Sequence, residues 1–461
     1  MRLSAAVAAL AAAGAIQEIC LLAGVPGLGL PFVVLALIGA VWLWFPSLEA
    51  IAVIAMYLGL ELVLPLQTGA GRYMDWLQHW QLALRYGGRP NAILSDFLIL
   101  RTPLFSQVSG AVSAHLPAYA AFQAASVVLN TLWLWPATLW IRDHAPDGVR
   151  GRLLTIALVP LLLAYGVYTW PWEFAGFFLL SAMWLVLQPG RVAAIGAGMA
   201  LAGACLVHPG ALGYALGLFA FAVLRRRVVP VMVGGAAVLA TQVSWVFDVT
   251  GGQPFRLFTS SLPARQTFAH PQVWLVSRLV IAAHSFFPQI GVDPARRWAD
   301  VVMGFVLFSL AGGLLVTTLV GRGWLAPSRI VRFTVGAGVL LNWAIYPPQN
   351  SDNMIDALFL GVLVYVVYVH ARVPAAVTRR LLVLEAATSA AFATLLAWYA
   401  WTVAPYDANL EIKNHYGARF FADMAGPWPG LVLIVLGGAL AALVVLQRSQ
   451  VVMPTRQTAA T

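Results

Sequence analysis

The chain consists of long apolar runs that are interrupted at intervals by glycine, proline or charged residues. Continuous apolar runs are typical of transmembrane helices, which need roughly 20 such residues each, whereas strands of a membrane β-barrel alternate apolar and polar positions. We therefore expect an all-α polytopic membrane protein with about 14 transmembrane helices. The expected helices lie near residues 4–24, 29–45, 49–66, 117–140, 152–168, 173–187, 192–207, 211–224, 228–247, 300–320, 331–347, 353–370, 381–403 and 429–447.

Composition agrees with this pattern. Hydrophobic residues make up 61% of the 461 positions and charged residues only 10%, whereas a soluble domain carries about 25% charged residues. No internal repeat or low-complexity linker marks a second folding unit. We expect one transmembrane domain over residues 1–447, followed by a short polar cytoplasmic tail over 448–461.

The basic residues predict the orientation in the membrane. Arginines occupy the short loops near 142–152, 191, 225–227, 322–332 and 372–380, whereas the short loops near 25–28, 169–172, 208–210 and 348–352 contain no lysine or arginine. Such asymmetry places the arginine-rich loops and both termini in the cytoplasm. The net charge of +10 therefore indicates topology and not a nucleic-acid partner. We expect a multi-pass protein of the bacterial inner membrane, whose first apolar run stays as an uncleaved helix.

This orientation leaves three long stretches on the outer side, at 67–116, 248–299 and 404–428. The first contains "YMDWLQHW", in which Asp75 and His79 stand one helical turn apart. Tryptophan and leucine side chains form a stripe beside them, which predicts a helix lying at the membrane interface. Gly87 and Gly88 end this helix, and a second short helix starts near Pro103. An interfacial anchor whose acid merely faces water remains an alternative to a reactive site.

The stretch "YMDWLQHWQLALRYGG…FLILRTPLFSQVSGAVSAHL", from Tyr73 to Leu116, resembles the GT-C superfamily of integral-membrane glycosyltransferases. That superfamily includes protein O-mannosyltransferases and aminoarabinose transferases. The resemblance implies a GT-C-like fold and inverting transfer of a sugar from a polyprenyl-phosphate-linked donor to a lipid or glycan acceptor at the periplasmic face. It also implies a catalytic role for Asp75, the acid of the first outer loop.

The chain departs from the family pattern in two ways. Three apolar helices precede the acid where the family usually has one, and no second acid stands beside Asp75. The motif therefore does not support a divalent metal, although a metal remains an alternative because Asp96 or Glu173 could approach Asp75 in three dimensions; no other cofactor is implied.

Transfer to a hydroxyl needs a base for the acceptor's proton and cations for the leaving phosphate. Asp75 is the candidate base, provided that Trp76 and Trp80 desolvate its carboxylate. His79 is a candidate for orienting Asp75 or relaying a proton, although a hydrogen bond at the interface would equally explain a histidine there.

Cationic residues of the outer stretches are candidates for holding the donor phosphate, since arginine binds phosphate bidentately. Arg278 stands in apolar sequence, where a charge is costly, yet snorkelling to lipid headgroups would also explain it. The candidates for phosphate binding are Arg278, Arg265, His284 and Arg101.

Aromatic and polar residues near the predicted outer turns are candidates for contact with the sugar or the acceptor. Interfacial aromatic belts and helix caps occur without any such role, and the last outer stretch is either a lid or a fixed loop. The candidates are Trp76, Glu173, Tyr346, Asp352, Lys413 and His415.

Two alternative functions remain open. A lipid-linked glycan ligase or polymerase would rely on the arginines of 248–299 and on His284. A transporter or lipid flippase would place polar groups and broken helices inside the membrane. Against the transporter, the intramembrane acids Glu18, Glu61 and Glu385 look isolated in the sequence, and no repeat relates them.

Overall fold

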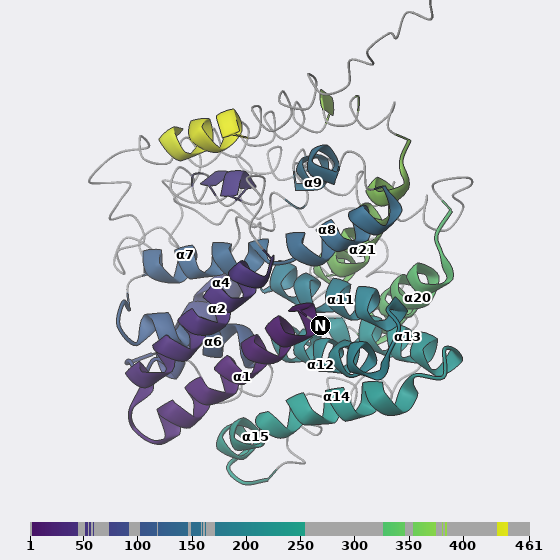
Figure 1. Ribbon diagram of the computed structural model, residues 1–461. Coiled ribbons are helices and arrows are strands. Elements are labelled where there is room, and N and C mark those ends of the chain that lie inside the picture. Colours follow the sequence, from purple (N-terminus) through teal and green to yellow (C-terminus); the bar gives the residue numbers. More distant parts are fainter. Residues whose placement is uncertain are drawn as a thin grey trace, which may run out of the picture.

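The computed structural model shows only helices, turns and loops in the part of the chain that it describes (Figure 1). Side chains are not described at 41–44, 73–78, 119–120, 150–151, 343, 345 and 354–358. The described residues are 2–44, 51–53, 55–56, 59, 73–91, 102–117, 119–145, 149–157, 159, 162, 171–253, 326–345, 354–374, 380, 383–384 and 431–440.

Most helices begin and end close to the predicted positions. The apolar run at 211–224, for example, is helical over the same residues. Proline or glycine precedes or follows many of the ends, as expected of residues that interrupt helices. The elements are α1 (Arg2–Leu22), η1 (Pro26–Gly29), α2 (Leu30–Trp44), α4 (Tyr73–Tyr86), α6 (Leu104–Ser113), α7 (Tyr119–Thr131), α8 (Leu134–His144), α9 (Val149–Ala157), α11 (Trp172–Leu187), α12 (Arg191–Val207), α13 (Ala211–Leu224), α14 (Val228–Thr241), α15 (Val243–Thr250), α20 (Arg329–Ile345) and α21 (Met354–Arg372).

One predicted single helix is broken. The run at 228–247 forms α14 and α15, whose axes differ in direction by 49°. Gln242 stands at the break between them. The break was not predicted because apolar residues continue on both sides of Gln242.

Length and hydropathy identify membrane-spanning candidates within the described residues. Two helical segments are long and apolar enough to cross a bilayer: α1 (Arg2–Leu22) and the segment Ala121–His144, which joins α7 and α8. The bent pair α14–α15 would make a third. Several shorter apolar helices lie beside them, among them α11, α12 and α13. The described part is therefore compatible with membrane association, while the expected count of about 14 spans stays a prediction.

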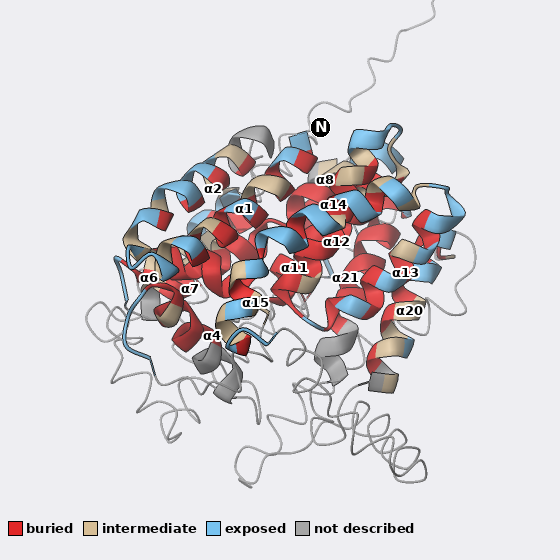
Figure 2. Cartoon of the chain, turned by 90° about the horizontal axis from the view of Figure 1, so that it is seen from below, coloured by how far each residue is buried: buried red, intermediate tan, exposed pale blue. Residues whose placement is uncertain are grey.

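The distribution of burial also fits a lipid environment. Helices α11, α12 and α21 form the buried centre, whereas α1, α2, α13 and α14 present exposed faces (Figure 2). Those exposed faces carry large apolar side chains, for example Leu35 at 66% exposure, Val229 at 66% and Leu224 at 63%. Soluble monomers rarely expose apolar surface on this scale, so lipid is the natural solvent for these faces.

Helices α12 and α14 cross in close contact through glycines. A Cβ atom added to Gly198 would lie 1.9 Å from the backbone oxygen of Val231, and one added to Gly234 would lie 1.9 Å from that of Ile195. Only glycine permits this distance between the two backbones. Small residues at helix crossings are typical of membrane bundles, where packing rather than water exclusion drives association.

The predicted arginine-rich loops meet at one end of the bundle. Arg227 donates hydrogen bonds to the backbone oxygens of Val186 and Gln188, at the end of α11. Arg152 donates to two backbone oxygens at the end of α21, at 2.7 and 2.6 Å. Each guanidinium thus satisfies carbonyls that a helix C-terminus leaves unpaired. We call this the arginine end, and its residues are Arg152, Arg225, Arg227, Arg329 and Arg372.

Short loops without basic residues meet at the opposite end. The ring centroids of Trp172 and His208 lie 3.7 Å apart, and Asn342 donates to the backbone oxygen of Gly210 at 3.0 Å. Described loops that the arginine distribution assigned to opposite sides of the membrane therefore lie at opposite ends of the bundle.

Candidate functional site

The two helices of the first polar motif, α4 and α6, pack side by side and run in the same direction. The rings of His79, in the middle of α4, and Phe105, at the start of α6, meet edge to face with centroids 5.6 Å apart. Seven residues further along α4, a Cβ atom added to Gly110 would lie 2.5 Å from the Cβ atom of Tyr86. The absence of a side chain at Gly110 therefore sets how closely the two helices approach.

Helix α6 also runs alongside α1. Glu18 of α1 contacts Gln107 of α6, and the ring of His115, just after α6, lies 3.0 Å from the backbone oxygen of Gly27. Because α1 begins beside the start of α12, at the arginine end, α4 and α6 both run toward the opposite end. His79 and Phe105 consequently lie inside the bundle.

The described part of α4 is buried except at Arg85, which is partly exposed. His79 is 3% exposed, Trp80 2%, Leu82 1% and Tyr86 1%. The predicted helix is therefore present, but the expectation that its polar face meets water at the membrane surface is wrong for residues 79–84. Neighbouring helices cover the face that the sequence pattern assigned to water, and this tertiary packing overrides the local pattern.

Three sequence motifs meet around Phe105. Besides His79 of "YMDWLQHW", its ring contacts Phe122 of α7, with centroids 6.1 Å apart, and Phe174 of α11, with centroids 6.3 Å apart. Phe105 belongs to "RTPLF" and Phe174 to "TWPWEF". Segments about 100 residues apart in the sequence thus share one buried aromatic junction.

Glu173 lies beside this junction, in the first turn of α11, with 0% of its surface exposed. Neither carboxylate oxygen has a hydrogen-bond partner among the described residues. The indole of Trp133 lies near this carboxylate. Instead of facing an outer turn, as expected of a sugar contact, Glu173 is enclosed, and a buried acid of this kind is typical of a functional position.

Several buried polar side chains gather around Gln107. Its amide nitrogen donates to Glu18 at 3.1 Å and to Gln242 at 3.0 Å. Gln17 donates to the backbone oxygen of Tyr86 at 2.7 Å. We call Gln17, Glu18, Gln107 and Gln242 the polar cluster. Glu18, which looked isolated in the sequence, is therefore part of a hydrogen-bonded group.

The polar cluster is incompletely satisfied. One oxygen of Glu18 and the amide nitrogen of Gln242 are buried without a hydrogen-bond partner among the described residues. Buried polar atoms are normally paired, so these two are available to a proton, a water or a small ligand. Gln242 stands at the 49° break between α14 and α15, where the helical hydrogen-bond ladder is interrupted.

An ion pair joins α4 to α15 beside the polar cluster. A terminal nitrogen of Arg85 lies 2.5 Å from a carboxylate oxygen of Asp248, and both side chains are about four-fifths buried. Burial alone would lower the pKa of Arg85, but the hydrogen bond to Asp248 and the neighbouring charges outweigh it and raise the pKa. Burial likewise raises the pKa of the Tyr86 phenol, and the Glu18 carboxylate adds to this effect. The guanidinium therefore stays charged and the phenol stays protonated.

Asp75 and Trp76 lie on α4, one turn before His79, with side chains outside the described part. Of the remaining predicted site residues, only Glu173 is described, and it directly precedes Phe174, which contacts Phe105. Outside the described residues lie Arg101, Arg265, Arg278, His284, Tyr346, Asp352, Lys413 and His415.

The polar cluster was missed in the sequence, although signals for two of its members were present. Gln107 follows "RTPLF" by two positions, and Gln242 interrupts an apolar run. A polar residue inside a membrane helix is a functional candidate by default. The described residues contain no group of three or more histidine, cysteine or acidic side chains that would bind a metal.

Comparison of the chain with models of protein families, with curated proteins and with solved structures finds no match.

Proposed function

We propose that the protein is a membrane-embedded glycosyltransferase that transfers a sugar from a polyprenyl-phosphate-linked donor to an acceptor hydroxyl, with Asp75 as the general base. The chemistry requires a carboxylate near the reacting hydroxyl and cations near the phosphate. The resemblance of residues 73–116 to GT-C enzymes suggests these roles, and the packing of α4 against α6 supports them.

The observation that carries the proposal is the parallel register of α4 and α6. His79 meets Phe105 near the start of α6, and Asp75 lies one turn before His79 on α4, which supports a position for Asp75 near the level at which α6 begins. Arg101 directly precedes Thr102 in the sequence. The proposed base therefore lies one helical turn from the contact with α6, and the proposed phosphate ligand Arg101 precedes α6 by three positions in the sequence.

The beginning of α6 adds a further attraction for phosphate. The first backbone N–H groups of a helix lack partners within the helix and carry a partial positive charge. Helix α6 begins at Leu104, after Pro103. A leaving phosphate at this level would meet the helix terminus, and Arg101 is proposed to supply a further positive charge.

The test uses the purified full chain in lipid nanodiscs and a panel of polyprenyl-phosphate-linked hexoses and pentoses with a radiolabelled sugar. Asp75→Asn should lower turnover at least 100-fold, within the range for loss of a general base, while donor binding persists. Asp143→Asn is the matched control, because Asp143 is an exposed acid whose carboxylate accepts a hydrogen bond from Trp184. Turnover of Asp75→Asn within threefold of the parent would refute the assignment.

A transporter is the second candidate, because the polar cluster lies at a broken helix. Gln242 at the 49° break binds Gln107, which also binds Glu18. Broken helices with buried polar groups are typical of transporter sites. Uptake of a labelled polyprenyl-phosphate sugar into proteoliposomes without covalent transfer, abolished by Glu18→Gln, would favour this function over the first.

A further inference from the structure

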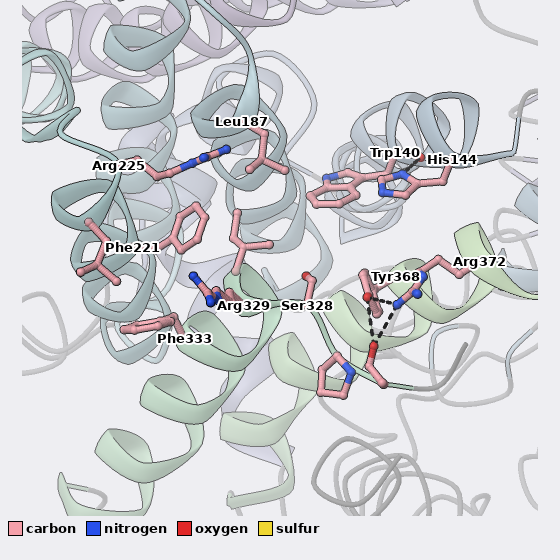
Figure 3. A pocket seen from close by; sticks show the side chains of 14 residues that line it. Trp140, His144, Leu187, Phe221, Arg225, Ser328, Arg329, Phe333, Tyr368 and Arg372 are labelled. Atoms are coloured by element: carbon pink, nitrogen blue, oxygen red, sulfur yellow. Dashed lines mark hydrogen bonds between the residues drawn. The ribbon is translucent and has the colours of Figure 1, made fainter. Parts of the chain in front are cut away.

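A cavity of about 820 Å³ opens at the arginine end, between α8, α13, α20 and α21 (Figure 3). It is remote from the Phe105 junction and from the polar cluster, and the glycosyltransferase proposal does not use it. Cationic and aromatic side chains line it together: Arg225, Arg329, Arg372, His144, Trp140 and Phe221.

The charge of the cavity is positive and is not neutralised within the described residues. No acidic side chain lines it, and none of its three arginines forms a salt bridge with a described carboxylate. Arg372 donates to the backbone oxygen of Ala326 at 2.9 Å and to the hydroxyl of Tyr368. Those partners are uncharged, so they fix the guanidinium without cancelling its charge.

The other cations of the cavity are less constrained. The guanidinium of Arg225 lies over the ring of Phe221, 5.8 Å from its centroid, an arrangement that holds the cation without a counter-ion. Arg329 is exposed. The ring of His144 stacks on Trp140 and donates from Nδ1 to the backbone oxygen of Trp140 at 2.8 Å, so its Nε2 remains for another partner.

Helix α20 begins at the wall of the cavity. Ser328 precedes its first residue, Arg329, and the Ser328 hydroxyl is buried with no hydrogen-bond partner among the described residues. The N–H groups of the first turn of a helix have no partner within it and attract anions. An unpartnered hydroxyl, a helix N-terminus and three arginines thus face one cavity.

We propose that this cavity binds a phosphate group, carried either by a lipid of the adjoining leaflet or by a free phosphate. Arginine forks, a serine hydroxyl and helix N–H groups are the donors that phosphate oxygens accept. Basic pockets between membrane helices commonly hold lipid headgroups. The neighbouring surface is apolar, with Leu224 at 63% and Phe333 at 39% exposure, and it can accommodate acyl chains beside the headgroup.

The test measures binding of short-chain phosphatidic acid to the purified full chain by native mass spectrometry, with diacylglycerol of the same chain length as the phosphate-free probe. The parent should bind phosphatidic acid and not diacylglycerol. The cavity variant Arg225→Gln/Arg329→Gln/Arg372→Gln should bind at least tenfold more weakly. The matched variant Arg142→Gln/Arg191→Gln/Arg226→Gln removes the same charge from exposed positions outside the cavity and should bind as the parent does.

The triple variant also removes Arg372, whose hydrogen bond to the Ala326 backbone oxygen stabilises the fold. The single variants Arg329→Gln and Ser328→Ala keep Arg372 and therefore provide a second measurement. Each should weaken binding at least threefold without lowering the melting temperature. Competition by millimolar inorganic phosphate would identify a free-phosphate site, and its failure to compete would identify a lipid site. The proposal would be overturned if the parent bound neither phosphatidic acid nor diacylglycerol, or if the cavity variant and the matched variant lost binding affinity equally.

Discussion

The amide nitrogen of Gln107 lies 3.1 Å from the carboxylate of Glu18, although the two residues are 89 positions apart in the sequence. The same nitrogen reaches Gln242, so one side chain of α6 connects α1 to the break between α14 and α15. Removal of this single amide would leave two buried polar groups without their partner.

Gln107→Leu should therefore destabilise the protein by on the order of 2–4 kcal/mol, since each buried group left unpaired costs about 1–3 kcal/mol. Equilibrium unfolding in mixed detergent micelles measures the change. Gln253→Leu is the matched control: Gln253 is exposed in the loop after α15, and its loss should change stability by less than about 0.5 kcal/mol. Equal effects of the two substitutions would contradict a structural role for the polar cluster.

The pair formed by Arg85 and Asp248 predicts a measurable coupling between α4 and α15. In a double-mutant cycle with Arg85→Met and Asp248→Asn, the two effects on unfolding free energy should be non-additive by roughly 1–3 kcal/mol, as for residues in direct contact. Single removal of Arg85 should cost more than removal of both partners, because it leaves Asp248 unpaired. Strict additivity would show that the pair does not form in the membrane.

The crossing of α12 and α14 predicts opposite outcomes at two adjacent glycines. Gly234→Ala forces a Cβ atom to within 1.9 Å of the Ile195 backbone oxygen and should cost on the order of 2–3 kcal/mol through overpacking. Gly235→Ala meets its nearest atom, the Gly198 backbone oxygen, at an ordinary 3.6 Å. Because alanine favours a helix over glycine, Gly235→Ala should leave the melting temperature unchanged or raise it. A larger loss at Gly235 would mean that the helices cross elsewhere.

The two ends of the bundle should be accessible from opposite sides of the membrane. The background is a variant in which Cys20 and Cys205 are replaced by alanine. In it, Arg226→Cys introduces a thiol at the arginine end and Asn91→Cys introduces one at the opposite end. Both positions are exposed. A membrane-impermeant maleimide applied to intact spheroplasts should label only the Asn91→Cys variant. Labelling of both thiols, or of Arg226→Cys alone, would refute the predicted orientation.

Features that depend on neighbouring residues in the sequence could be predicted. Helix α13 occupies the predicted residues, and α4 ends before Gly88, whose φ of +66° is one that glycine adopts readily. The grouping at one end of the described arginines from the short loops after α8, α11, α13 and α21 followed from the order of loops along the chain. Each of these features follows from the local composition or from the number of helices that separate two loops.

Features that depend on distant partners could not be predicted. The burial of His79 results from helices that surround α4, and the connection of Glu18 to Gln242 passes through a residue of a third helix. The bend at Gln242 interrupts an apolar pattern that is otherwise continuous. Hydropathy measures how apolar a residue is, but it carries no information about which helices are neighbours in the fold.

The ion pair of α4 and α15 has a consequence for the biogenesis of the protein. Its two residues are 163 positions apart, and at about 5–20 residues per second a ribosome needs roughly 10–30 s to synthesise that length. During this interval Arg85 has no Asp248 to pair with, and α4 cannot reach its final environment. Insertion during synthesis would therefore have to keep α4 in a polar or shielded position until α15 has emerged, when more than half of the 461 residues have been made.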